Sequence, residues 1–205
     1  MDGIHPWWLG QPGEGYWLEI TDREFFGRRL ATRRHDRRCM TAWSHRLVLH
    51  VNPGDVVFHY FEREHAIVGW STALGRTAQD RLRNGLRGML AWRRNVAPIW
   101  TVSLSGVTPL PVPLTIEEVA ERQGALVDDL MALEERVGDP LYYPFEVGRP
   151  NETRPLPGYL FKLPALFVGT FPQLASSAPM LTPATGRWAV RPEFSPVAAR
   201  ARTTT

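Results

Sequence analysis

The alternation of apolar and polar side chains predicts a strand-rich first half of the chain. The candidate strands are residues 16–21 (YWLEIT), 47–51, 56–60 (VVFHY), 66–74 (AIVGWSTAL) and 99–107. Asn52-Pro53-Gly54-Asp55 predicts a turn before the third of these, and the charged residues 62–65 predict a hairpin tip after it. The Arg-rich residues 27–42 show no clear period, so we expect a loop there with at most one helical turn.

The second half carries helix signals. Thr115 and Glu118 fit a capping box, and the helix that follows is expected to break near Gly124 and to resume over 125–137. Residues 76–95 could hold a short helix. Residues 159–163 predict another strand, and Pro164 is well placed to open a final helix that reaches about Leu174.

These elements predict one α+β domain, built as a small curved β-barrel flanked by helices. We expect an N-terminal arm over residues 1–15, the folded domain over 16–174, and a flexible tail or linker over 175–205, where Ser, Ala, Pro and Thr dominate. No internal repeat is visible.

Charge adds a possible ligand class to this picture. The net charge is only +3, but Lys162 is the only lysine and the other basic residues are arginines. Arginine suits phosphate and stacks on bases, although a GC-rich genome produces the same bias. Two groups of arginines lie close together in the sequence: Arg28, Arg29, Arg33, Arg34, Arg37 and Arg38, and then Arg76, Arg81, Arg83, Arg87, Arg93 and Arg94. Such groups on a nearly neutral chain favour nucleic-acid binding.

Composition also limits the location and the chemistry. No apolar run approaches the roughly 20 residues of a membrane span, and the N-terminus lacks the apolar core of a signal peptide. The single Cys39 cannot form an internal disulfide, so we expect a cytoplasmic protein that does not bind a membrane.

Catalytic and metal-binding motifs are missing from the sequence. We find no P-loop, no nucleophile elbow and no zinc signature, and none of the six histidines has metal-ligand spacing. His59 sits on a candidate strand, where it could face a groove, but an ordinary partly buried histidine is the favoured interpretation. We therefore expect no catalysis, no metal and no cofactor.

Aromatic residues beside small polar ones are the features that suggest a binding site. The candidates are Trp17, Trp43, Ser44, Tyr60, Trp70 and Ser71. A flipped base needs aromatic faces to stack on and polar groups for its edge, and flanking arginines would hold the phosphates. The alternative is that these rings belong to the core, since aromatic residues dominate cores.

Four segments resemble the EVE domain of the PUA superfold, which is related to YTH domains. They are GYWLEITDRE (15–24), TAWSHRL (41–47), NPGDVVFHYFEREHAIVGWSTALG (52–75) and PLPGYLFKLPALFVGTFPQL (155–174). The most similar variety occurs in modification-dependent restriction proteins, often beside a nuclease domain. The resemblance spans residues 15–174 and implies a pocket for a flipped modified base, typically a modified cytosine such as 5-methylcytosine.

The same resemblance implies roles for individual residues. Trp43 would stack on the base and Ser44 would contact its edge, while Trp17 and Trp70 would form other walls and Tyr60 or Ser71 would supply a polar contact. The cluster Tyr142-Tyr143-Pro144-Phe145 would close one side or contact the nucleic-acid backbone. The backbone contacts would come from Arg33, Arg34, Arg37, Arg38, Arg46, Arg76 and Arg149.

Four hypotheses stay open at this point. The first is a reader of modified DNA that works with a nuclease partner or a fused domain, and the second is a module that reads a modified RNA base. The third is an enzyme acting on a nucleotide. The fourth is a domain whose tryptophans are core and whose arginines serve a protein interface.

Overall fold

Two β-sheets and a group of helices make up the protein, for which a computed structural model describes residues 4–33, 43–81, 98–146 and 153–176. The strands are β1 (Tyr16–Thr21), β2 (Arg29–Arg33), β3 (Val56–Phe61), β4 (Ala66–Thr72), β5 (Ala78–Arg81), β6 (Pro98–Ser103), β7 (Thr108–Thr115) and β8 (Leu160–Lys162). The helices are α1 (Trp43–Arg46), the 3-10 helix η1 (Leu47–His50), α3 (Ile116–Val137), α4 (Ala165–Thr170) and α5 (Pro172–Ala175).

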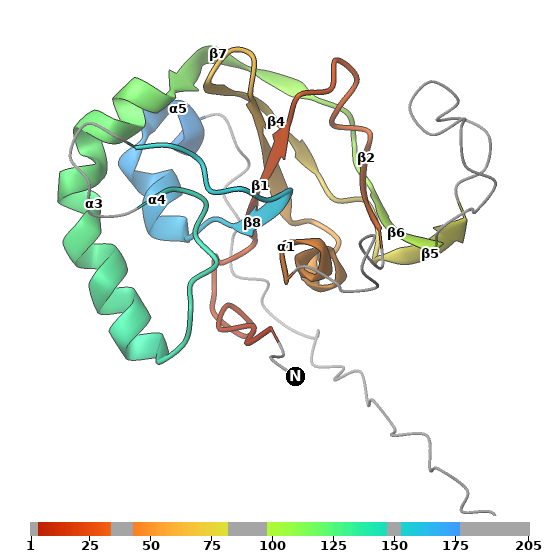
Figure 1. Cartoon of the computed structure of the whole chain (residues 1–205), viewed down its shortest axis with the longest axis horizontal. Helices are drawn as coiled ribbons and strands as arrows, with labels where there is room; N and C mark the ends of the chain where they lie inside the picture. The colour runs from red at the N-terminus through yellow and green to blue at the C-terminus, as the bar shows by residue number, and fades with distance from the viewer. Residues whose placement is uncertain (1–3, 34–42, 82–97, 147–152, 177–205) are drawn as a thin grey trace, which may run out of the picture.

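The larger sheet has the order β7-β4-β3-β1-β8, and the smaller has the order β2-β6-β5. In Figure 1, α3, α4 and α5 gather on one side of the larger sheet, while the smaller sheet lies on the other side. The α+β class with flanking helices is therefore confirmed. Within the described residues the strands form two separate sheets and not one closed barrel.

Strand alternation divides the side chains of the larger sheet between its two faces. Glu19 lies beside His59 in the register of β1 and β3, and Ser71 of β4 contacts His59 from the same face. Neighbouring residues point the opposite way, so Phe58 and Trp70, which pair across β3 and β4, share the other face. The predicted strands over 16–21, 56–60 and 66–74 are confirmed.

Two predictions in the first half are wrong. Residues 47–50 form η1 instead of a strand, because Leu47, Val48 and Val51 are buried at helical spacing while Leu49 is 42% exposed. The expected loop contains β2, whose Leu30 and Thr32 point inward between exposed arginines. The rest of that segment, residues 34–42, lies outside the described residues.

The long helix α3 begins as predicted but does not break. The Thr115–Glu118 capping box is present in both directions, and Gly138 ends the helix at φ 71°. Gly124 costs about 1 kcal/mol relative to alanine in a helix. That cost is offset by a buried apolar stripe that continues across the glycine, formed by Val119, Leu126, Leu130 and Leu133.

The final helix is divided by Pro172. Phe171 adopts an extended conformation because a residue before proline is disfavoured in the helical region, so α4 ends and α5 starts afresh. The strand predicted over 159–163 is confirmed as β8, and 99–107 is confirmed in part as β6. In the segment 76–95, which could hold a short helix, β5 occupies 78–81, and the rest of the segment lies outside the described residues, so a short helix there stays a prediction.

The edge strand β7 carries prolines at 109, 111 and 113. The backbone N–H of Ile116 bonds to the carbonyl of His65, just before β4, so Leu114 also faces β4 and the nitrogen of Pro113 faces the open edge, where no ladder hydrogen bond is lost. Toward the start of β7 the pairing shifts register and resumes at Gly69 and Pro109.

Candidate functional site

Trp43 is an exposed aromatic ring in a fixed position. It starts α1, is 41% exposed, and contacts the rings of Tyr142 at 5.3 Å and Phe161 of β8 at 5.5 Å between centroids. Both contacts are tilted or edge-on, the arrangement that aromatic pairs prefer. One part of the indole is therefore held by the protein and another part is open to solvent. Ser44, the next residue, is buried.

Tyr142 has a strained backbone directly beside Trp43. Its φ is 55°, a conformation that costs a non-glycine residue about 1–3 kcal/mol. Two hydrogen bonds hold it there: its hydroxyl accepts from the N–H of His5 at 2.9 Å, and its carbonyl accepts from the N–H of Lys162 at 3.1 Å. Strain of this kind is common at functional sites.

Arginines lie on both sides of Trp43 in the sequence. The Thr32 hydroxyl of β2 donates to the carbonyl of His45 at 3.1 Å, which joins the end of β2 to α1. Arg33 is exposed at that strand end, and Arg46 is half-buried on α1. Arg76 is exposed after β4. Within the described residues none of these three forms a salt bridge.

The other predicted arginines cannot be placed. Arg34, Arg37 and Arg38 lie between Arg33 and Trp43 in the sequence but outside the described residues, and so does Arg149.

Behind Tyr142 a set of rings leads into the core. Trp8 of the N-terminal arm is 4% exposed and meets Tyr142, Trp17 and His50 at centroid distances of 6.0, 5.3 and 5.7 Å, each nearly perpendicular. Trp7 adds a fourth perpendicular contact at 5.8 Å. We call Trp43, Tyr142, Trp8 and Trp17 the ring series, because each contacts the next from the surface inward.

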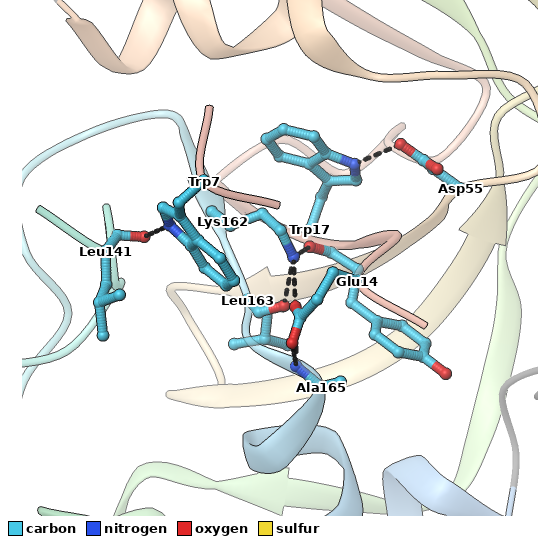
Figure 2. A network of polar contacts seen from close by, with 9 residues as sticks. Trp7, Glu14, Trp17, Asp55, Leu141, Lys162, Leu163 and Ala165 are labelled. Carbon is cyan, nitrogen blue, oxygen red and sulfur yellow. Dashed lines mark hydrogen bonds and ion pairs between the residues drawn. The ribbon is translucent and has the colours of Figure 1, made fainter. Parts of the chain in front are cut away.

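Figure 2 shows how a buried lysine fixes the inner end of the ring series. The Nζ of Lys162 is completely buried and donates to Glu14, to the carbonyl of Tyr16 and to the carbonyl of Leu163, at 2.9–3.1 Å. It also lies 5.2 Å from the ring centroid of Trp7 and 5.7 Å from that of Trp17.

Burial lowers the pKa of Lys162 to about 8, although the Glu14 carboxylate opposes the shift. The same carboxylate accepts the N–H of Ala165 at the start of α4. The arm is therefore attached to β8 and to α4 through one acidic residue.

Trp17 is a structural residue in this arrangement. Its indole N–H donates to Asp55 at 2.7 Å, and the ring is fully buried (Figure 2). Burial raises the pKa of Asp55 to about 6, against the effect of its hydrogen bonds from Asn52 and Trp17. The ring has no open face for an incoming base in this conformation.

A second polar group lies inside the larger sheet. The Oγ of Ser71 is 2.7 Å from Nε2 of His59, and Nδ1 of the same ring is 2.8 Å from Glu19. The Tyr159 hydroxyl donates to the other oxygen of Glu19 at 2.6 Å and accepts from the N–H of Ala31 on β2. Burial and the Glu19 charge raise the pKa of Tyr159 well above its usual value. We call these four side chains the polar row.

The polar row includes the same types of group as a nucleophile, its base and an orienting carboxylate. His59, Ser71 and Glu19 are all buried, at 0–2% exposure. Phe26 lies over the His59 ring at 5.3 Å. The polar row connects β1, β3 and β4 to β2. Both ring nitrogens of His59 and both carboxylate oxygens of Glu19 are hydrogen-bonded within it.

The structure does not bring the six predicted pocket residues together. Trp17 and Ser71 belong to one face of the larger sheet, whereas Trp70 and Tyr60 belong to the other, where Tyr60 packs on Phe145. Trp70 is half-buried, and its indole nitrogen has no hydrogen-bond partner in the part of the chain that the structure describes. Only Trp43 presents a substantially exposed ring, and the Tyr142 cluster named from the sequence supplies its neighbour.

Several residues of this region carry little signal in the sequence. Trp8 falls in the predicted arm, and Glu19, Tyr159 and Lys162 lie in segments that resemble EVE domains but received no role in the site. The contact between Tyr159 and Glu19 spans 140 positions. In the sequence, Lys162 stands out only as the single lysine of an Arg-rich chain. Lysine and arginine are not interchangeable in a buried site, so this choice of residue indicates a specific set of partners for its ammonium group.

Comparison with models of protein families and with curated protein sequences gives no match. Solved structures with a similar fold include the crystal structure of ASCH from Zymomonas mobilis, at 12% identity and a TM-score of 0.43, covering 80% of this chain and 95% of that one. The N-terminal domain of Staphylothermus marinus McrB has 14% identity and a TM-score of 0.37 over 60% and 94% of the two chains. The DUF55 domain of human thymocyte nuclear protein 1 has 13% and 0.34 over 59% and 86%.

At these scores the likenesses do not assign a family, and membership of the EVE family stays a prediction. Among the described residues, no helix is long and apolar enough to cross a membrane. Within the same residues, no three His, Cys, Asp or Glu side chains are grouped to hold a metal ion.

Proposed function

We propose that this protein is a non-catalytic nucleic-acid-binding domain that stacks a base of its ligand on Trp43. The observation that carries this proposal is the exposed Trp43 indole, held by Tyr142 and Phe161 beside arginines that form no salt bridge within the described residues. An exposed aromatic platform contributes about 1–3 kcal/mol for each base that it stacks.

Arginines around the platform support a phosphate-bearing ligand. Arg46 lies on the same helix as Trp43, and Arg33 is brought to that helix by the Thr32–His45 hydrogen bond. The sequence between them adds Arg34, Arg37 and Arg38. Contacts from such side chains to the backbone fix position, while the base contact supplies selectivity.

The resemblance to EVE domains supplies the finer part of the proposal. We propose a modified cytosine such as 5-methylcytosine in duplex DNA as the first ligand to test, with a nuclease domain or partner that acts on the bound DNA. A modified base in RNA is the alternative ligand for the same platform, because it requires the same ring and the same arginines.

The test is fluorescence anisotropy with matched duplexes that carry cytosine, 5-methylcytosine, 5-hydroxymethylcytosine or N6-methyladenine, and with single-stranded RNA. We expect Trp43→Ala to weaken binding roughly five- to 150-fold, which corresponds to the loss of about 1–3 kcal/mol of stacking. Phe25→Ala is the matched control, because Phe25 is another exposed aromatic residue, at 94%.

Equal weakening by both substitutions would contradict a base platform at Trp43. Stronger binding of the RNA than of every duplex would favour the RNA alternative. Binding of all duplexes alike, with no effect of Trp43→Ala, would leave only the arginine contacts.

A second candidate function is ester hydrolysis by Ser71, which the distances in the polar row favour. Ser71 would attack the ester carbonyl while His59 takes its proton and passes it to the leaving alcohol, and water would then release the acyl group. Burial of Ser71 ranks this candidate second. Labelling of the folded protein by a fluorophosphonate probe, lost in Ser71→Ala, would support it, and no labelling would exclude it.

A further inference from the structure

The site occupied by Trp8 has the composition of a base-binding site. Three of its walls, the rings of Trp17, His50 and Tyr142, lie outside the arm, and the fourth is Trp7, the neighbour of Trp8 on the arm. Each ring is 5.3–6.0 Å from the Trp8 ring and nearly perpendicular to it. The occupant itself is a planar two-ring heteroaromatic group, similar in size to a purine. Burial lowers the pKa of His50, so its imidazole is neutral at pH 7 and offers one donor and one acceptor.

The indole of Trp8 forms no hydrogen bond through its buried N–H with the groups around it in the described residues. The neighbouring tryptophans differ: Trp7 donates to the carbonyl of Leu141 and Trp17 donates to Asp55. A buried donor without a partner is unfavourable and uncommon in native proteins. The site therefore leaves the one polar group of its present occupant unsatisfied, which weakens its hold on the Trp8 ring.

We propose that the Trp8 position is a binding site for a planar nucleobase, and that Trp8 is its internal occupant, which moves out when the N-terminal arm swings away. This inference rests on the proposed function, since Trp43 and Tyr142 would then lead a base from the surface to the site. The contact from Trp43 to Tyr142 and the contact from Tyr142 to Trp8 give that route.

The arm is built so that this part can move while its end stays attached. Glu14 holds the arm to Lys162 and α4. Between Trp8 and Glu14, Gly10 and Gly13 adopt φ angles of 77° and 81°, each with open space on the side where a side chain would lie, and Leu9 is 57% exposed. On the other side of Trp8, the arm is held by Trp7, which is buried and donates to the carbonyl of Leu141. It is also held by His5, which forms an exposed ion pair with Asp139 at 2.8 Å and donates its backbone N–H to the Tyr142 hydroxyl.

The experiment empties the site in the full chain with Trp8→Gly and uses Leu9→Ala, on the same arm, as the control. Thermal unfolding is measured with indole, adenine, cytosine and 5-methylcytosine at millimolar concentration. We expect indole to restore much of the lost Tm of Trp8→Gly, and at least one base to raise it by about 2–4 °C. None of the four compounds should stabilise Leu9→Ala beyond its effect on the wild-type protein.

Rescue by indole without rescue by any base would overturn the proposal, because the site would then be apolar packing only. Where Trp8→Gly does not fold, the double variant His5→Ala/Asp139→Ala loosens the arm and keeps Trp8. That variant should bind nucleic acid about threefold or more tightly, because a larger fraction of molecules has an empty site. Unchanged or weaker binding would overturn the proposal.

The proposed function and this site fail separately. A wild-type protein that binds no nucleic acid, together with Trp8→Gly rescued by a base, would reject the first and retain the second. Binding that depends on Trp43, together with no rescue by any base, would do the opposite.

Discussion

The ring series and the polar row are both built from side chains with hydrogen-bonding groups, but they differ in what they leave unused. In the polar row both His59 nitrogens and both Glu19 oxygens have partners at 2.6–2.8 Å. In the ring series the Trp8 N–H has none among the described residues, and the Trp43 ring is partly open to solvent. A saturated buried network stabilises one structure, whereas unused donors and open rings can serve a ligand. From this difference we expect the polar row to contribute stability and the ring series to contribute binding.

The largest expected effect tests the polar row. Changing His59→Ala leaves a buried Glu19 carboxylate with one partner fewer and removes a ring from the core, so we expect the free energy of unfolding to fall by about 3–5 kcal/mol. Urea denaturation measures it. His65→Asn is the control, because His65 is exposed and asparagine tolerates its φ of 50°.

If His59→Ala lowers the free energy of unfolding no more than the His65→Asn control does, the stabilising role expected of the polar row is contradicted. The contrast between the two regions is also contradicted if the folded fraction of His59→Ala loses nucleic-acid affinity as Trp43→Ala does, since the polar row would then contribute to binding.

A smaller effect concerns pH and the lysine that fixes the inner end of the ring series. The pKa of Lys162 is lowered from 10.5 to about 8 in the folded protein, so the unfolded chain binds more protons between these values. Stability from this group therefore rises as pH increases from 8 to 10.5. We expect the wild-type protein to gain stability relative to Lys162→Met over that window, measured by urea denaturation at several pH values. A difference that stays constant with pH would show that Lys162 is not held as a buried charge.

The smallest expected effect tests whether Arg46, which lies on the same helix as Trp43 at the outer end of the ring series, contacts a phosphate. Arg46→Ala should weaken binding to all nucleic acids alike and reduce the slope of log K against log salt by about 0.9 for a single phosphate contact. Arg63→Ala is the control, because Arg63 pairs with Glu24 at 3.1 Å. An unchanged slope would remove Arg46 from the interface.

The local parts of the fold were predictable from the sequence. β1, β3 and β4 follow from period-2 alternation, and the ends of α3 follow from the capping box and Gly138. The errors come from context: η1 has a short apolar run that fits a strand as well as a helix, and the Gly124 position is stabilised by packing that the local sequence does not reveal.

The candidate site was predictable only in part. Trp43 stood out because its sequence neighbours are polar, and it is exposed. Alternation shows which residues of one strand share a face, but it does not show which face each strand presents to its neighbours, and so Trp17 and Trp70 were assigned to one pocket. Trp8 takes its contacts from the arm, β1, η1 and the segment before β8, an arrangement that requires the complete fold.

The prolines of β7 determine how the larger sheet can be extended. At that edge the nitrogen of Pro113 offers no donor, so a strand from another molecule could not form a regular ladder there. At the opposite edge, β8 is three residues long and its Lys162 N–H is already bonded to the carbonyl of Tyr142. A nuclease domain or a second copy that associates through this sheet would have to contact side chains, because neither edge accepts an added strand.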